Sequence, residues 1–80
     1  MAYAKTEEEW GGRTSVYLKA ELKKAGLTYS DLAKRLKKHG FKDESVSSIT
    51  MKLKRASFGA AFLLACLAAL ELEGIRLEDI

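Results

Sequence analysis

The stretch from residue 27 to residue 55 constrains the fold of this 80-residue chain more than any other part of it. It opens with a capping box, in which the Thr28 hydroxyl can accept a hydrogen bond from the backbone of the first helical turn. Asp31, three residues later, can accept one in return from the Thr28 amide. Leu27 and Leu32 stand where a hydrophobic staple requires them. The pattern therefore predicts a helix that begins directly after Thr28.

Two short helices are predicted within this stretch. The first runs from Tyr29 to His39 and closes at Gly40, with Tyr29, Leu32, Ala33 and Leu36 facing inward. The second runs from about Ser45 to Arg55, is capped by Asp43 or Ser45, and buries Val46, Ile49 and Leu53. Two short helices that are joined by a turn and are rich in Lys and Arg are typical of a helix-turn-helix DNA-binding unit.

The composition predicts an all-α fold, a compact bundle of four to five helices. The chain contains no Pro, many Ala, Leu and Lys residues, and no alternating β-branched run. The apolar run from Phe58 to Leu72 is too short for a bilayer, which needs about 18–20 residues. No secretory leader is visible at the N-terminus, and Cys66 has no second cysteine to pair with. We therefore expect a reducing, cytoplasmic compartment.

The remaining helices are predicted from caps and glycines. Thr6 to Glu9 forms a second capping-box pattern. Gly11-Gly12 either ends a short N-terminal helix or lies inside a longer one at a cost of about 1 kcal/mol per glycine, and we expect a break or kink there. Thr14 or Ser15 would then cap a helix that ends at Gly26, and Ser57 would cap a fourth helix over about 58–72. Gly26, Gly40 and Gly74 are each followed by an apolar residue, as in a Schellman motif. The expected organisation is an N-terminal extension or short helix over 1–12 and a helix-turn-helix domain over 13–80.

Positive charge is concentrated in the centre of the chain. Residues 13–55 carry 12 basic and 4 acidic side chains, a net charge of +8, whereas residues 1–12 and 56–80 are net acidic. Such an asymmetry is expected of helices that face a polyanion, although Lys-rich helix faces are also found where nothing but solvent contacts them.

The sequence contains no catalytic constellation. His39 stands alone beside Lys38 and Gly40, and Cys66 has no neighbouring ligands that could complete a metal site. No glycine-rich phosphate loop is present. We therefore expect no enzyme activity, no metal and no cofactor.

From Val16 to Ile80 the chain resembles the phage repressor and Cro-type (lambda repressor-like, XRE-like) helix-turn-helix superfamily, as an uncharacterised bacterial branch. Residues 18–27 are similar to its first helix and exit glycine, and Thr28-Tyr29-Ser30-Asp31-Leu32-Ala33 to its second-helix start. Ser57 to Leu70 and then residues 75–80 are similar to its fourth helix and closing turn. The chain departs from the family in a longer turn over 37–44 and in Tyr29, which replaces the usual Gln.

The resemblance implies a DNA-binding role in transcription regulation, with the third helix in the major groove. Tyr29, near the Thr28 cap, can contact a phosphate through its hydroxyl, and the basic side chains of both helices would contact further phosphates. The third helix carries no Gln, Asn or Arg near its start, so its base-facing residues are expected to distinguish poorly between bases. The predicted DNA-binding residues are Thr28, Tyr29, Lys34, Arg35, Ser47, Ser48, Met51, Lys52, Lys54 and Arg55.

A second class of function remains open, a protein-interaction or dimerisation domain that keeps this fold without sequence-specific DNA binding. The fourth helix carries no charge from Phe58 to Leu70. A stripe of Phe62, Cys66 and Leu70 would form a large apolar patch if it were exposed, and a homodimer would cover it. The competing expectation is that the segment around Trp10 folds over this stripe and completes a monomeric core.

Overall fold

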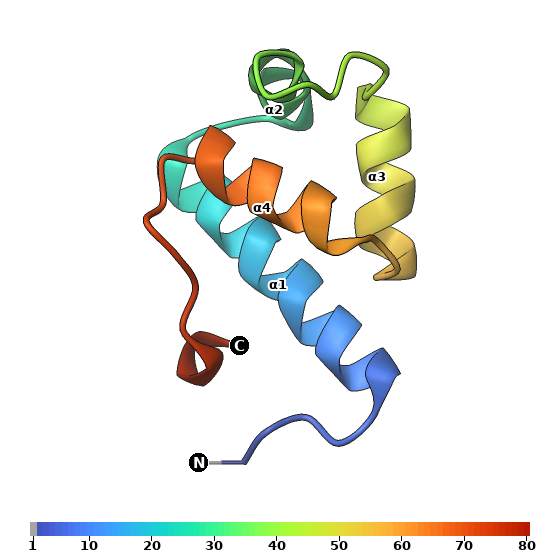
Figure 1. The fold of residues 1–80 in the computed structure, drawn as a ribbon, viewed down its shortest axis with the longest axis vertical. Coiled ribbons are helices and arrows are strands. Elements are labelled where there is room, and N and C mark those ends of the chain that lie inside the picture. Colours follow the sequence, from blue (N-terminus) through green and yellow to red (C-terminus); the bar gives the residue numbers. More distant parts are fainter. Residues whose placement is uncertain (1) are drawn as a thin grey trace.

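Helix caps and glycine stops divide the chain into four α-helices and a closing 3-10 turn. The computed structural model describes residues 2–80, and its elements are α1 (Glu7–Ala25), α2 (Tyr29–Lys37), α3 (Val46–Arg55), α4 (Ala60–Ala69) and η1 (Leu77–Asp79). No strand occurs in this range, so the predicted all-α bundle is confirmed. In Figure 1, α2 is seen almost along its axis, whereas α3 runs down one side of the molecule.

One hydrophobic core joins the four α-helices. Its buried members are Leu18 and Leu22 of α1, Leu32, Ala33 and Leu36 of α2, Ile49 and Leu53 of α3, and Phe62, Ala65, Cys66, Leu67 and Ala69 of α4, followed by Leu70. The predicted inward faces of α2 and α3 are therefore confirmed, except that Tyr29 is only half-buried and Val46 at the start of α3 is exposed. The position of Val46 in the first turn of α3 leaves it beyond the edge of this core.

Two of the three predicted glycine stops are confirmed. Gly26 and Gly40 have φ angles of 69° and 92°, a left-handed conformation that glycine adopts without a steric penalty. The amide of the next residue donates to the carbonyl five positions back in each case, from Leu27 to Leu22 at 3.0 Å and from Phe41 to Leu36 at 3.0 Å. Helix α2 itself ends at Lys37 rather than at His39, because a tighter turn fills residues 38–40.

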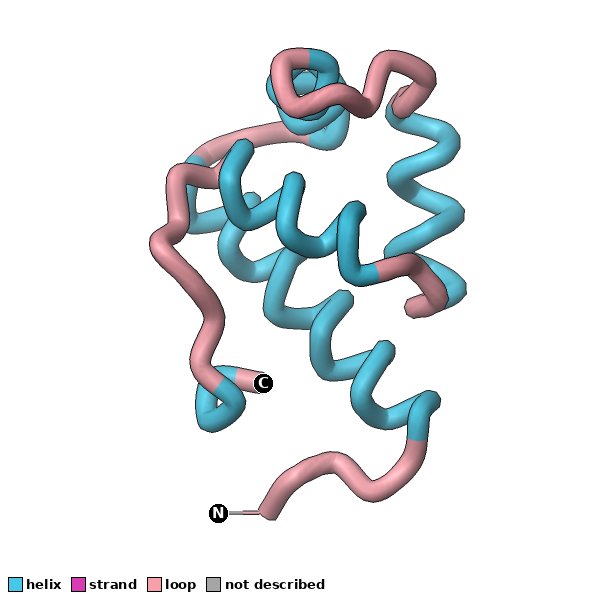
Figure 2. Tube along the Cα trace, in the orientation of Figure 1, coloured by secondary structure: helices cyan, strands magenta, loops and turns pink. Residues whose placement is uncertain are grey.

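The third stop, predicted at Gly74, is wrong. Glu71 takes the left-handed conformation instead, with φ 60°, and the Leu72 amide donates to the Leu67 carbonyl at 2.9 Å. The start of α4 also differs, because Gly59 rather than Ser57 is its N-cap residue. Helix α4 is therefore shorter at both ends than predicted, and a long connection leads from it to η1 (Figure 2).

The predicted break at Gly11-Gly12 is wrong, because α1 runs through both glycines as one helix of 19 residues. Thr14 and Ser15 are consequently buried positions inside α1 and not caps, and the Thr14 hydroxyl donates to the Trp10 carbonyl at 2.7 Å. Thr6 caps the helix as predicted by accepting from the Glu9 amide at 3.1 Å. The boundary drawn between residues 12 and 13 thus falls within a continuous helix.

The apolar stripe proposed as a dimer contact is buried in the chain's own core. Phe62 is 4 %, Cys66 is 1 % and Leu70 is 9 % exposed. Phe58 and Phe41 pack against Phe62, with ring centroids 5.5 and 6.1 Å away. The expectation that this stripe lies at the surface is therefore wrong. The opposite side of α4, which includes Leu64, is exposed instead.

Candidate nucleic-acid interface

The predicted interface begins at the α2 capping box, which the structure confirms. The Thr28 hydroxyl accepts from the Asp31 amide at 3.1 Å, and an Asp31 carboxylate oxygen accepts from the Thr28 amide at 2.9 Å. The hydrogen bonds that the Thr28 amide and the Thr28 hydroxyl donate to this carboxylate lower the pKa of Asp31. The Thr28 hydroxyl is therefore engaged in starting α2, and the half-buried Tyr29 is the first helical residue.

The long turn over 38–45 is held in place by two side chains that point inward. Phe41 packs its ring edge against Phe62 of α4. Glu44 has a side chain that is only 8 % exposed, and its carboxylate accepts from the Lys52 ammonium group and from the Ser48 hydroxyl, the latter at 2.7 Å. Because both anchors are internal, the extra residues of this turn join α2 to α3 in a fixed arrangement.

Lys52 belongs to this internal network. Besides its ion pair with Glu44, its Nζ lies 4.6 Å from the centroid of the Phe62 ring, a cation–π contact. Burial alone would raise the pKa of Glu44, but the hydrogen bonds from Lys52 and Ser48 outweigh it, and the pKa is lowered. Lys52, which was predicted to contact a phosphate, thus has an internal partner that sequence spacing did not indicate.

Arg35 and Ser48 also have partners within the chain. The Arg35 guanidinium donates to the Ala69 carbonyl at 2.9 Å, where α4 ends and its last carbonyls lack helical partners. The Ser48 hydroxyl accepts from the Ser45 amide at 2.8 Å and so completes the capping box of α3. Both side chains thus stabilise helix ends, although they lie on the two helices in which DNA contacts were predicted.

The other predicted residues are free to meet a ligand. Lys34, Lys54 and Arg55 are exposed and make no ion pair within residues 2–80. Ser47 and Met51 are exposed on the outward side of α3, away from Ile49 and Leu53. This subset brings three cations and two adaptable side chains to the surface of α2 and α3.

Three further exposed cations lie at the end of α2 and in the turn that follows it, and they were not among the predicted site residues. Lys37 and Lys38 follow Lys34 by one helical turn, and Lys42 lies in the turn between the helices. All three are exposed and without an ion pair in the described part of the chain. The three- and four-residue spacing from Lys34 would have placed the first two on its face. We call Lys34, Lys37, Lys38, Lys42, Lys54 and Arg55 the basic surface.

Arg55 also lines a groove of about 860 Å³ between the N-terminal part of α1 and the α3–α4 turn. Trp10 and Phe58 form its apolar part, and Glu7 and Glu8 stand on its rim. Gly59 and Ala60 at the start of α4 also line it, and Gly59 provides no side-chain cap for that helix. The groove therefore brings Arg55 near two carboxylates of α1.

Residues 2–80 contain no group of three His, Cys, Asp or Glu side chains that could hold a metal ion. Burial raises the pKa of the Cys66 thiol to about 12, so it is protonated at neutral pH. No helix in this range is both long and apolar enough to cross a membrane.

A family model described as "Domain of unknown function (DUF6471)" matches residues 10–75. The match spans all four α-helices from Trp10 onward and includes the whole basic surface. Neither a curated protein nor a solved structure matches the chain.

Proposed function

Because the chain belongs to the DUF6471 family, described only as a domain of unknown function, we propose its function from its own residues. It is a DNA-binding module of the helix-turn-helix type that acts in transcription regulation. The basic surface contacts the phosphates, and the outward side of α3 faces the bases. The observation that carries this proposal is the collection of six unpaired cations over α2, α3 and the turn between them.

The ion pair of Glu44 with Lys52 leaves few exposed carboxylates to offset the cations of the basic surface. Glu44 and Lys52 form an ion pair whose charges cancel, so together they add no net charge to this region. Between residues 34 and 55 the exposed charged side chains are then the six cations and a single carboxylate, Asp43. Phosphate binding releases condensed counterions from DNA, and an unpaired cation gains most from that exchange because it breaks no existing ion pair.

The outward side of α3 supports binding with little base discrimination. Ser47 can donate to or accept from either base of a pair, and Met51 offers a flexible apolar contact. Neither makes the bidentate contacts by which Arg, Asn or Gln distinguish bases. The resemblance of residues 16–80 to the repressor and Cro-type superfamily supports the same assignment of α3.

A protein-interaction domain is the second candidate function. The exposed apolar side chains of Val46 and Met51 on α3 favour it, since apolar groups at a surface contribute more to protein contacts than to phosphate binding. The salt dependence of binding separates the two candidates. Phosphate contacts give a steep negative slope of log K against log salt concentration, which a contact to an apolar protein surface does not.

Binding of an arbitrary duplex, measured by fluorescence anisotropy from low to moderate salt, tests the proposal. The double change Lys54→Glu, Arg55→Glu should weaken binding to every duplex alike and reduce the salt slope by about 1 or 2 units. Lys5→Glu, Arg76→Glu is the matched control, because it changes the net charge equally at residues outside α2 and α3. Absence of binding by the native chain at low salt, or equal binding by the two variants, would refute a DNA role.

A second comparison addresses the bases. Ser47→Ala and Met51→Ala should leave the salt slope unchanged, because neither side chain carries charge. Any preference between duplexes should change in these variants.

We also propose the cytoplasm as the compartment, since one unpaired cysteine fits a reducing environment.

A further inference from the structure

The outward face of α1 is an unpartnered surface with an unusual residue pattern. Val16 lies on the side of the helix opposite the buried Leu18 and Leu22, and it is 66 % exposed. Successive residues of a helix turn by about 100°, so Glu9, Gly12, Ala20 and Lys23 all lie within about 40° of Val16 around the axis. We call these five residues the outer stripe of α1.

Gly12 is not explained by anything within the chain. Apart from its own helix backbone and chain neighbours, no atom lies within 4 Å of the position that its Cβ would occupy, so a methyl group would meet open space. The neighbouring Gly11 differs, because its Cβ would overlap the Ala56 carbonyl oxygen. A glycine inside a helix costs about 1 kcal/mol relative to alanine. Gly11 serves close packing in the monomer, whereas Gly12 would serve close packing only if a second helix approached it.

The small residues and the charged residues of the outer stripe are placed at equal distances on the two sides of Val16. Gly12 and Ala20 are each four residues away from Val16, and Glu9 and Lys23 are each seven residues away. If a second α1 packed antiparallel to the first with Val16 at the two-fold axis, Gly12 of each copy would face Ala20 of the other. Two small residues at each such point allow helix backbones to approach closely, while the two valines pack at the centre.

The two ends of α1, on either side of Val16, carry charges of opposite sign. Helix α1 has Glu7, Glu8 and Glu9 in its first turn and Lys23 and Lys24 in its last. In the antiparallel arrangement the acidic end of each copy would face the basic end of the other. Glu9 would oppose Lys23, an exposed cation without an ion pair within residues 2–80. A parallel arrangement would instead place like charges together at both ends.

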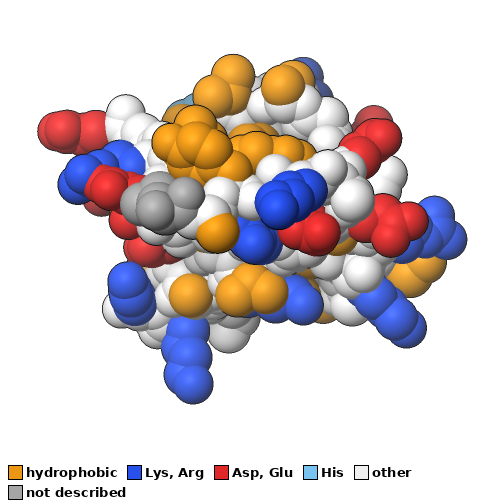
Figure 3. Space-filling view, turned by 90° about the horizontal axis from the view of Figure 1, so that it is seen from below, with side chains coloured by type: hydrophobic (Ala, Val, Ile, Leu, Met, Phe, Trp, Pro, Cys, Tyr) orange, Lys and Arg blue, Asp and Glu red, His pale blue; other side chains and the backbone are white. Residues whose placement is uncertain are grey.

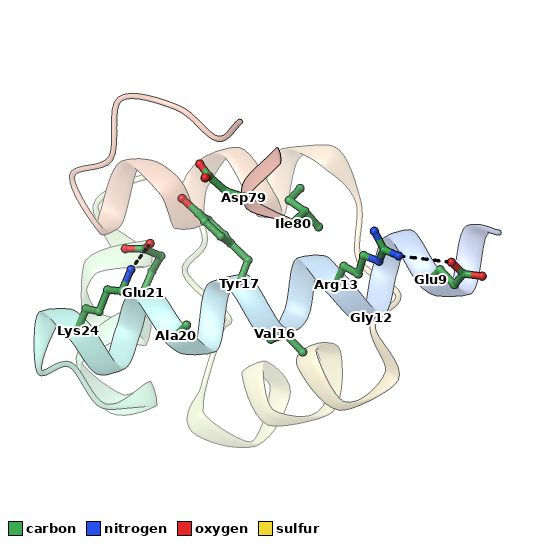
Figure 4. Close-up of a pocket in the computed structure, with 10 residues that line it drawn as sticks. All are labelled: Glu9, Gly12, Arg13, Val16, Tyr17, Ala20, Glu21, Lys24, Asp79 and Ile80. Atoms are coloured by element: carbon green, nitrogen blue, oxygen red, sulfur yellow. Dashed lines mark ion pairs between the residues drawn. The ribbon is translucent and has the colours of Figure 1, made fainter. Parts of the chain in front are cut away.

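A groove of about 710 Å³ runs along one side of the outer stripe, between α1 and the C-terminal turn. Figure 4 shows Tyr17 rising from α1 toward Asp79, with Ile80 beside it, and Val16 and Gly12 of the outer stripe also line this groove. In the view of Figure 3, apolar side chains gather in the upper part of the face and lysines and arginines project from its lower edge. The groove provides further apolar surface, at Tyr17, Ala20 and Ile80, next to the helix that would be covered.

We propose that two copies of this chain associate through the outer stripe of α1, packed antiparallel about Val16. The contact combines a central pair of valines, two Gly12–Ala20 approaches and two Glu9–Lys23 ion pairs. It does not depend on the proposed DNA function and uses a surface different from the basic surface. It also replaces the buried stripe of α4 as the site of a homodimer.

Sedimentation equilibrium of the native chain across the micromolar to millimolar range tests association first. The average mass should rise toward that of a dimer. Val16→Glu should raise the dissociation constant at least about tenfold, because it places two carboxylates against each other at the axis. Leu64→Glu is the matched control: Leu64 on α4 is 65 % exposed, close to the value for Val16, and lies outside the stripe. Circular dichroism should show both variants folded.

A charge exchange tests the antiparallel register. Glu9→Lys alone and Lys23→Glu alone each create two like-charge pairs in their own dimer, so each should associate more weakly than the native chain. Mixed together, these two variants form a dimer in which both pairs are attractive. The mixed dimer should be about tenfold tighter than either variant alone, and this preference should shrink at high salt.

Three results would overturn the proposal. The first is a monomer mass at every concentration, and the second is loss of association in Leu64→Glu but not in Val16→Glu. The third is the absence of any preference for the mixed pair while both charge variants remain folded. Gly12→Leu supplies an independent check, since the open space around Gly12 accommodates leucine in the monomer while the close approach in the dimer does not.

Discussion

A methyl group on Gly11 would overlap the carbonyl oxygen of Ala56, so α1 and the residue that ends α3 are packed backbone against backbone. Ala56 itself has a φ of 53°, which turns the chain sharply from α3 toward α4. The pair fixes the N-terminal half of α1 against the α3–α4 turn. Gly11 is therefore required by packing between segments 45 residues apart in sequence, and not by the local path of its own helix.

The two adjacent glycines should respond oppositely to alanine. Gly11→Ala should lower the free energy of unfolding by about 1–3 kcal/mol, because the turn at Ala56 must move to admit the methyl group. Gly12→Ala should raise it by up to about 1 kcal/mol, because alanine is the better helix former and meets open space. Urea unfolding of dilute protein measures both. Equal effects in the two variants would show that the close contact with Ala56 is not rigid.

Replacement of Glu71 by glycine should stabilise the folded protein. It is an exposed residue with a φ of 60°, a conformation that costs an L-residue about 1–2 kcal/mol. Glu71→Gly should therefore raise the free energy of unfolding by roughly 1 kcal/mol, less the extra chain entropy of glycine in the unfolded state. Gly26→Ala is the reciprocal variant and should lower the stability, since Gly26 has a φ of 69°. A loss of stability in Glu71→Gly would contradict the account of this helix end.

Lys52 and Lys54 should differ in stability although they are two residues apart on α3. Lys52→Met leaves the largely buried carboxylate of Glu44 without its cationic partner and should cost about 2 kcal/mol. Lys54→Met removes an exposed, unpaired cation and should change the stability by less than about 0.5 kcal/mol. Thermal unfolding monitored by circular dichroism gives the comparison, and DNA binding should show the opposite order of effects.

Acid should destabilise the fold partly through Glu44 and Asp31. The folded pKa of each carboxylate is lowered, so each contributes stability that is present at neutral pH and is lost as the pH falls through that lowered pKa. The loss should therefore begin below about pH 4, where the carboxylates of the unfolded chain take up protons. In Glu44→Gln, unfolding midpoints should lie below those of the native chain at pH 7 and approach them at pH 3. A gap that stays constant with pH would argue against the lowered pKa of Glu44.

Cys66 should be inert in the folded protein. Its thiol is buried and its pKa is raised to about 12, chiefly because burial disfavours the thiolate. A disulfide reagent at pH 7–8 should therefore label the native chain orders of magnitude more slowly than the urea-unfolded chain. Rapid labelling of native protein would mean that α4 opens readily, and hydrogen exchange at Leu67 and neighbouring amides would then be fast as well.

The sequence by itself determined the helices whose ends depend on contacts between residues close to one another in the chain. The capping box at Thr28 and the left-handed glycines at 26 and 40 depend on hydrogen bonds that span five residues or fewer, so residue type and spacing were sufficient to predict them. The same holds for the inward positions of Leu32, Leu36, Ile49 and Leu53, because a helix repeats with a fixed period. A capping residue or a helical repeat therefore leaves the chain few other local conformations.

Only the tertiary structure decided which cations are free and why particular glycines are present. Lys52 and Arg35 could not be told from Lys54 and Lys34 by spacing, because their partners, Glu44 and the Ala69 carbonyl, reach them through the fold. Gly11-Gly12 suggested a break because propensity counts only the helix itself, whereas the packing of α1 against Ala56 stabilises a continuous helix there. The physical reason is the same throughout: long-range contacts add free energies of one to a few kcal/mol that local propensities, each below about 1 kcal/mol, cannot anticipate.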